Sequence, residues 1–409
     1  MKLVSGDMVW TNLSNIPIKY NYLDKNIECD VLIIGAGVTG AIASYYLTKE
    51  NINTVMVDKN IVGYGSTRAS TSILQYEIDT DLVGLKGLIG EKKAVRGFKL
   101  CEKAVYDIKN IVNDLDDDCD FTLKECFYYT KNSSEVDLLK KEYQLRKKHG
   151  FDVEFLGKEK SKKYFSFPIE GGIYSNKGAA QINPYKFTHA LINKARKKSL
   201  RVYENTRIDK YFIENDHVVL KTNNDFLIKA KKVIIATGYE GKDFIKKDIV
   251  NLTRTFTIVT KPVKKFLGWF NTSIIRDNED SYTYLRTTKD NRIIIGGEDI
   301  KIGNENSKIS NLTNDDLIAK KKYDILSNKL KGYFPGINDI EIEYRFSGVF
   351  GVTKDGLPYI GEYDKCPNFY FCLGYGSNGI IYSVLGGQIN RDIILNKDNP
   401  DKELFKFNR

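Results

Sequence analysis

Residues 30–47 read DVLIIGAGVTGAIASYYL, and this stretch decides the fold. The β-branched run Val31–Ile34 predicts a short buried strand, the glycines predict a tight turn, and the apolar run after them predicts a helix that ends near Leu47. A second β-branched run closes on Asp58, so residues 29–58 hold one complete strand–helix–strand unit. Parallel strands of this kind are buried on both faces, which predicts the α/β class with a doubly wound sheet.

Three glycines, Gly35, Gly37 and Gly40, form the pattern G-x-G-x-x-G between this strand and its helix. The first permits the tight turn, the second lets a pyrophosphate approach the backbone, and the third lets the helix pack closely on the strand. The helix N-terminus then faces the anion. Asp58, at the end of the second strand, is expected to accept hydrogen bonds from an adenosine ribose. The stretch predicts a Rossmann-like dinucleotide-binding domain, and the motif alone leaves NAD and FAD open.

The composition is that of a globular protein with room for two or three domains. The chain has 409 residues, of which 42% are hydrophobic and 28% charged. Its net charge is +10, but the lysines are dispersed among acidic residues along the whole length. This pattern favours a solvated basic surface over a nucleic-acid or lipid-binding patch. We therefore expect no nucleic-acid partner.

The cysteines and histidines argue against a metal site. The six cysteines contain no C-x-x-C pair, and the chain has three histidines. Structural zinc is therefore not expected. The N-terminus lacks the apolar core of a secretory signal, and glycines interrupt the one long uncharged stretch. These features predict a cytoplasmic protein with reduced thiols and no membrane span.

Further elements can be predicted along the chain from periodicity and turn residues. Helical patterns run to about residue 115 and over 134–149, 184–198 and 380–395, and strands are expected at 126–130, near 202 and at 231–238. Residues from 171 resemble extended chain and turns. Residues 251–331 alternate β-rich runs with polar turns, which predicts an antiparallel sheet with a trailing helix.

Three later segments resemble the FAD-dependent D-amino-acid-oxidase-like superfamily, which includes glycine oxidase, sarcosine oxidase and the gamma-glutamylputrescine oxidases. Residues 66–71 (STRAST) match its small-residue segment beside the flavin, and residues 233–238 (VIIATG) match its strand beside the cofactor. Residues 355–361 (DGLPYIG) and 374–380 (GYGSNGI) match its closing motif and the glycine-rich turn before the last helix. The matches occur in the family's order over nearly the whole chain.

The resemblance implies a non-covalent FAD, because members that attach FAD covalently use a Cys near a segment that aligns with residues 348–353, where this chain has none. It also implies an FAD-binding domain at 28–85, 170–245 and 340–395, interleaved with a mixed or antiparallel-sheet substrate domain at 86–169 and 246–339. Together with the glycine motif, it assigns the cofactor to Gly35, Gly37, Gly40, Asp58, Ser66, Thr67, Arg68, Ser70, Thr71, Ile208, Ala236, Thr237, Gly238, Asp355, Gly376, Ser377, Asn378, Gly379 and Ile380.

The family transfers hydride from a C–N bond to flavin N5, so the resemblance implies an FAD-dependent amine or amino-acid oxidase or dehydrogenase. Its Y-x-R…I-G-G segment, which roofs the substrate pocket, aligns with Tyr284, Arg286 and Glu298. Arg286 could bind a substrate carboxylate or form a structural salt bridge. Glu298 could recognise a cationic amine or be a solvated turn carboxylate. Of Tyr282 and Tyr284, only one is expected to face the pocket.

One departure concerns the substrate. Glycine-oxidase-like members carry an Arg in a G-x-R-P segment that clamps the α-carboxylate, and this chain has Phe350 there. A phenyl ring cannot replace a bidentate guanidinium. We therefore expect an amine, a polyamine derivative or an N-alkyl compound rather than an ordinary α-amino acid. The electron acceptor is O2 or another carrier, and Ile294 stands where sarcosine-oxidase-like relatives place a Lys that promotes reaction with O2.

Three alternatives remain open from the sequence. An NAD-dependent Rossmann reductase would be colourless when pure. A flavin-bearing subunit or non-catalytic FAD-binding protein would hold a flavin that no amine reduces. A tRNA-modifying relative of the same superfamily is disfavoured, because no strongly basic segment is visible.

Overall fold

The computed structural model of the chain describes residues 3–14, 19–214, 216–245, 249–302, 312–313 and 316–409. The described strands form two sheets, one of eight strands and one of ten. Residues 303–311, within the range expected to carry the central sheet, lie outside the described residues. None of the described helices has both the length and the apolar character that crossing a membrane requires.

The eight-stranded sheet carries the predicted strand–helix–strand unit. Its strands are β17 (Tyr359–Tyr363), β18 (Cys366–Leu373), β11 (Leu227–Ile235), β2 (Ile27–Ile34), β3 (Thr54–Val57), β8 (Arg201–Tyr203), β9 (Ile208–Ile213) and β10 (Val218–Thr222). The central pairs β11–β2, β2–β3 and β3–β8 are parallel. This arrangement confirms the predicted α/β class.

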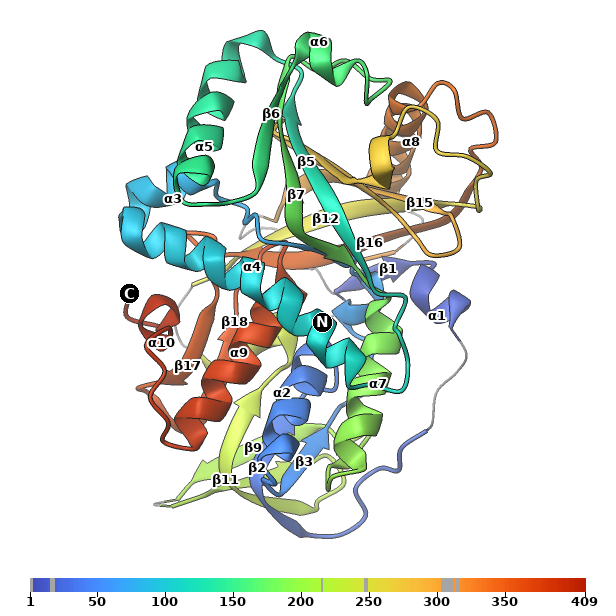
Figure 1. Ribbon diagram of the computed structural model, residues 1–409. Coiled ribbons are helices and arrows are strands. Elements are labelled where there is room, and N and C mark those ends of the chain that lie inside the picture. The colour runs from blue at the N-terminus through green and yellow to red at the C-terminus, as the bar shows by residue number, and fades with distance from the viewer. Residues whose placement is uncertain (1–2, 15–18, 215, 246–248, 303–311, 314–315) are drawn as a thin grey trace.

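Two of the helices, α2 (Val38–Lys49) and α9 (Gly379–Ile394), pack directly on this sheet. The helices of the described chain are α1 (Val9–Leu13), α2 (Val38–Lys49), α3 (Leu82–Ile89), α4 (Glu91–Asn113), α5 (Val136–Lys148), α6 (Lys158–Ser161), α7 (Pro184–Arg196), α8 (Leu317–Tyr333), α9 (Gly379–Ile394) and α10 (Lys402–Phe405). Helix α2 packs between α7 and α9, side by side in Figure 1. Helix α7 begins where expected, because Asn183 caps it and Pro184 occupies its first turn.

The ten-stranded sheet is mixed. Its strands are β1 (Val4–Gly6), β16 (Ile342–Val352), β12 (Asn251–Thr260), β15 (Ile293–Lys301), β14 (Thr283–Thr287), β13 (Ile274–Asp277), β5 (Thr122–Thr130), β7 (Gly171–Gln181), β4 (Ile73–Gln75) and β6 (Val153–Gly157). The β13–β5 pair is parallel and its neighbours are antiparallel. Helix α8 packs on β12 and β15, and α5 packs on β6 and β7.

Three strands lie in a different sheet from the one their predicted domain implies. β4, β7 and β16 fall within the ranges expected for the FAD-binding domain, yet their hydrogen bonds place them in the ten-stranded sheet. Periodicity identifies a strand but not its partners, which are far away in sequence. We propose to assign these three strands to the substrate domain.

Residues 171–181 form one strand of 11 residues, where extended chain and turns were expected. The glycines suggested turns, but Gly172 has a packing reason instead. A Cβ atom there would lie 2.3 Å from the ring of Phe127 on the neighbouring strand. Glycine in this strand therefore permits close approach of an aromatic ring.

The N-terminal segment forms β1 and α1, which the sequence patterns did not predict. β1 pairs with β16, and the indole Nε1 of Trp10 in α1 donates to the carbonyl of Ser70 at 2.7 Å. The segment thereby ties residues 66–72, here called the flavin loop, to the edge of the ten-stranded sheet.

Candidate active site

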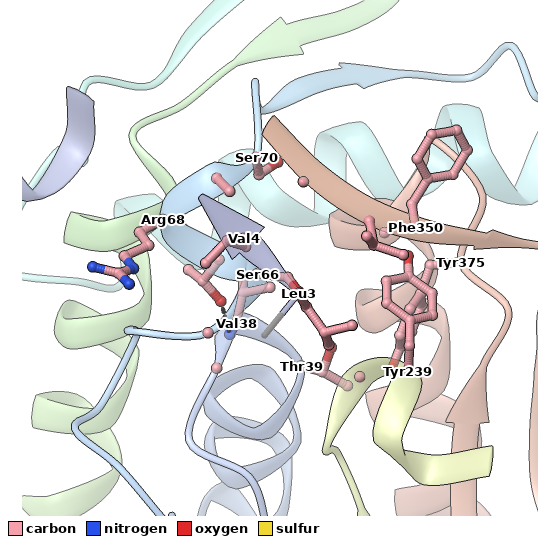
Figure 2. A pocket seen from close by; sticks show the side chains of 18 of the residues that line it. Leu3, Val4, Val38, Thr39, Ser66, Arg68, Ser70, Tyr239, Phe350 and Tyr375 are labelled. Atoms are coloured by element: carbon pink, nitrogen blue, oxygen red, sulfur yellow. Dashed lines mark hydrogen bonds between the residues drawn. The ribbon is translucent and has the colours of Figure 1, made fainter. Parts of the chain in front are cut away.

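A cavity of about 730 Å³ is lined by residues from both sheets. Its lining includes Leu3, the β1 residue Val4 and the 3-10 helix at Ser66–Ala69. Figure 2 shows Tyr239, Phe350 and Tyr375 on one side of the cavity and Arg68 on the opposite side. Every predicted cofactor residue lines this cavity except Gly40 and Asp355.

The glycine motif divides into two glycines that the fold requires and one that keeps the cavity open. Gly35 has φ +109°, and a Cβ there would lie 2.4 Å from the carbonyl oxygen of Ala236. A Cβ on Gly40 would lie 2.0 Å from the carbonyl oxygen of Gly35. A Cβ on Gly37 would meet only the Thr67 hydroxyl, at 3.0 Å. Gly37 thus leaves room for a ligand beside the N-terminus of α2, as the pyrophosphate role requires.

Asp58 holds the glycine turn as well as lining the cavity. Its carboxylate accepts the backbone N–H of Ala36 at 2.7 Å and that of Asn60 at 2.8 Å. Burial raises the pKa of this carboxyl above its ordinary value, while the two N–H groups oppose that rise. The carboxylate retains free lone pairs, so the predicted ribose contact remains available.

The segment 66–71 is fixed from behind and faces the cavity. The Thr67 hydroxyl accepts the N–H of Val38 at 3.0 Å, which caps the first turn of α2. The guanidinium of Arg68 lies over the ring of Tyr64 at 4.6 Å, and its buried Nε has no acceptor. An open donor beside a helix N-terminus suits an anionic ligand.

The glycine-rich turn before α9 also reaches the cavity, and sequence reasoning missed the residue that holds it. The carboxylate of Asp79 accepts the N–H of Ser377 at 3.0 Å and also its hydroxyl. The side-chain amide of Asn378 donates to the carbonyls of Gln75 and Glu77. No local motif marks Asp79, because it lies about 300 residues before the turn.

Asp355 is a structural residue in this fold. Its carboxylate pairs with Arg409 at 2.9 Å and accepts the N–H of Leu357. It therefore fixes the C-terminus and its own loop, and the structure does not bring it into the cavity.

The predicted substrate residues separate into one that lines the cavity and two that do not. Tyr284 lines it, with its hydroxyl 3.2 Å from that of Thr255. Burial raises the pKa of Tyr284 to about 12, so the phenol is neutral at pH 7. Tyr282 lines the cavity too, with its ring centroid 5.8 Å from that of Tyr284. The expectation that only one faces the cavity is wrong, because residues two apart share a face of an extended chain.

Arg286 takes neither of the two roles considered from the sequence. It is fully buried, and its guanidinium donates to the carbonyls of Thr71, Ser72 and Ile182 at 2.8–3.1 Å and to that of Thr287 at 2.9 Å. Burial lowers the pKa of Arg286 to about 9, which leaves it protonated at pH 7. The side chain joins the flavin loop to the ten-stranded sheet.

Glu298 points to helix α8. Its carboxylate pairs with Lys322 at 2.8 Å and with Lys329 at 2.7 Å. The pairing between β12 and β15 shifts register beside Gly297, and Glu298 has φ +58°. Such a bulge turns the following side chain away from the face that the alternation predicts. The proposed role in amine recognition is therefore not supported by its position.

Cysteine and metal chemistry are not visible in this cavity. All six cysteines are buried, and none lines the cavity. Within the described part of the chain, no group of three His, Cys, Asp or Glu side chains could hold a metal ion.

Comparisons with known proteins agree with this geometry. The family model described as "DAO: FAD dependent oxidoreductase" matches residues 30–392. Glycine oxidase of Bacillus subtilis (strain 168) is 24% identical over 387 residues, which covers 92% of this chain and 96% of the relative. Gamma-glutamylputrescine oxidoreductase of Escherichia coli (strain K12) is 21% identical over 385 residues, 92% of this chain and 85% of the relative. The crystal structure of glycine oxidase from Geobacillus kaustophilus superposes with a TM-score of 0.76 at 19% identity, over 91% of this chain and 96% of that chain.

Proposed function

The chain belongs to the family of FAD-dependent oxidoreductases, and from this premise we propose that it oxidises the C–N bond of a small amine or amino-acid-like substrate. FAD is its cofactor, which decides between the two dinucleotides that the glycine motif left open. One observation carries the proposal: a single cavity joins the dinucleotide cradle to the aromatic wall formed by Tyr282 and Tyr284.

The residues present fit FAD. Gly37 keeps the space beside α2 clear, and two buried polar atoms at the cavity, Nε of Arg68 and Oγ1 of Thr237, have no partner among the residues that the structure describes. Buried polar atoms without a partner are rare and costly, so a polar ligand along this wall would stabilise the fold. A cavity of about 730 Å³ lies within the range of cofactor sites.

When bound, FAD supplies the two-electron acceptor that protein side chains lack. The substrate loses a hydride from carbon and a proton from nitrogen to solvent, and the resulting imine hydrolyses in water. Tyr284 is neutral at pH 7, so it positions the amine by hydrogen bonding rather than removing a proton. Phe350 and Tyr375 line one side of the cavity with aromatic rings, which limit the contact of water with that side.

The acceptor of the electrons is proposed as O2 or another carrier. Ile294 offers no guide to it, because it packs in an apolar cluster with Val4, Trp10 and Val259 and does not line the cavity. A charge at this position would be buried in that cluster.

The FAD is expected to be held without a covalent bond, since no cysteine or histidine lines the cavity. Acid precipitation of the purified yellow protein should therefore leave the flavin colour in the supernatant. Absorbance spectra of pellet and supernatant check this. Colour that stays in the pellet would mean a covalent link to another side chain.

Anaerobic titration with a panel of primary, secondary and N-alkyl amines tests the proposed function. We expect at least one amine to bleach the flavin absorbance, with the matching carbonyl compound as product. An unrelated reductant such as dithionite serves as the control that the flavin can be reduced. If dithionite bleaches the flavin and every amine fails, the protein is a flavin carrier rather than an amine oxidoreductase.

A further inference from the structure

Arg276 stands apart among the residues that form the substrate wall. It lies on β13 and is 8% exposed, with Tyr128 and Tyr284 as its partners on the two neighbouring strands. Among the described residues that the ten-stranded sheet contributes to the cavity, it is the only charged one. The rest of this wall is aromatic, aliphatic or uncharged polar.

Other buried arginines of this sheet have complete sets of acceptors. Arg254 pairs with Asp316 at 2.8 Å and also donates to Ser347, and Arg292 pairs with Asp290 and Glu343. Within the described residues, Arg276 has no carboxylate within ion-pair distance, and its buried Nε has no acceptor. Its protein contact is the ring of Tyr128, 4.6 Å from the guanidinium carbon.

The acids that interact electrostatically with Arg276 also have other partners. Asp81 accepts the N–H of Gly84 at the start of α3. Glu77 pairs with Arg146, and Asp79 accepts both the N–H and the hydroxyl of Ser377. Burial opposes the charge of Arg276, but Tyr128, Glu77 and Asp79 together with Tyr282 raise its pKa above the ordinary value. The guanidinium is therefore a protonated, buried donor that opens into the cavity. A carboxylate that enters the cavity can therefore pair with this donor without displacing an existing ion pair.

We propose that Arg276 binds a carboxylate of the substrate, so that the enzyme acts on an amine that also carries a carboxylate group. This inference rests on the proposed function and narrows its substrate class. A guanidinium offers parallel N–H donors at the spacing of the two carboxylate oxygens, which a neutral wall cannot provide. The hydroxyls of Tyr282 and Tyr284, on the same wall, are further donors for the same ligand.

The position of Arg276 changes the meaning of Phe350. Both residues line the cavity, but Phe350 lies on β16, and β12, β15 and β14 run between it and β13. Three strands therefore separate the two residues, and across the sheet Arg276 aligns with Phe346 of β16 rather than with Phe350. The missing clamp on β16 therefore removes a carboxylate site from one end of the wall, while Arg276 provides one at the other. The sequence favoured an amine, a polyamine derivative or an N-alkyl compound over an ordinary α-amino acid. Under this proposal the substrate carries a carboxylate that is held at a different place from the family's clamp.

Binding of benzoate and benzamide to the purified holoenzyme tests the subsite, because the two probes share a shape and differ in charge. Perturbation of the flavin spectrum and titration calorimetry measure the binding. We expect benzoate to bind roughly tenfold or more tightly than benzamide. Arg276→Gln should remove this preference, and Arg276→Lys should restore part of it. Flavin content and thermal stability of each variant confirm that it is folded.

Arg254→Gln is the matched control, because Arg254 is equally buried in the same sheet but does not line the cavity. It should leave the ratio of the two affinities unchanged. Equal binding of the two probes, undetectable benzoate binding, or a preference that survives in Arg276→Gln would overturn the proposal.

Matched substrates separate this inference from the proposed function. Anaerobic bleaching is measured with amino acids and their amides, such as proline with prolinamide and sarcosine with its amide. We expect the acids to reduce the flavin at lower concentration, and the difference to vanish in Arg276→Gln. If the amides react as well as the acids, the carboxylate subsite fails and the amine chemistry stands. If no amine reacts but benzoate binding depends on Arg276, the subsite stands and the proposed function fails.

Discussion

Gly37→Val is expected to yield a folded protein that carries almost no FAD. Gly37 has φ −80°, which any residue adopts, and a Cβ there would meet only the hydroxyl of Thr67 at 3.0 Å. The backbone therefore tolerates the substitution, whereas the added methyl groups enter the cavity beside the N-terminus of α2. We expect the flavin content to fall to about a tenth of wild type or less. A tenfold loss of affinity corresponds to about 1.4 kcal/mol, and a steric clash of this kind costs more than that.

The flavin-to-protein absorbance ratio measures this loss, and far-ultraviolet circular dichroism measures the fold. Gly87→Ala is the matched control, because Gly87 lies in α3 with open space around its Cβ position. It should keep full flavin content. Gly40→Ala provides the contrast, because its Cβ would lie 2.0 Å from the Gly35 carbonyl and should disturb the fold itself. Full flavin content in Gly37→Val would contradict the prediction that the pyrophosphate binds at this turn.

The cofactor half of the site could be predicted because its constraints are local. Gly35, Gly37 and Gly40 are set by one turn and one helix packing on its own strand, so their spacing alone carries the information. Asp58 follows from the same unit. The fold class was predictable for the same reason, since the strand and helix patterns of residues 29–58 lie next to each other in sequence.

The substrate half depends on contacts between distant segments. The family's Y-x-R segment suggested either a pocket role or a structural salt bridge for Arg286, but its acceptors at Thr71, Ser72 and Ile182 lie more than 100 residues away in sequence. The position predicted for Glu298 was wrong because a bulge beside Gly297 turns its side chain, and the sequence pattern does not reveal such a bulge. Arg276 was missed for the opposite reason: among the described residues no carboxylate lies within ion-pair distance of it, which becomes visible only when β13 is placed next to β5 and β14.

Arg286→Met is expected to lower stability rather than to alter substrate selection. The guanidinium satisfies carbonyls of Thr71, Ser72, Ile182 and Thr287 from the interior, and methionine can donate to none of them. Each buried acceptor left without a donor costs about 1–3 kcal/mol, so the loss of donors to four carbonyls corresponds to a fall of roughly 4–12 kcal/mol in the free energy of unfolding. That is a large part of the 5–15 kcal/mol by which proteins are typically stable.

Urea unfolding followed by intrinsic fluorescence measures this difference, and Arg276→Gln is the control from the same sheet. The two variants should behave in opposite ways, because Arg286 faces carbonyl groups of the protein and Arg276 faces the cavity. Arg286→Met should unfold at a much lower urea concentration and lose flavin together with its fold. Two of the carbonyls that Arg286 holds, those of Thr71 and Ser72, belong to the flavin loop. Arg276→Gln should keep its fold and flavin while losing the preference for carboxylates. An Arg286→Met protein as stable as wild type, with weakened binding of carboxylates, would return Arg286 to the substrate site and leave the flavin loop held by other contacts, such as the bond from Trp10 to Ser70.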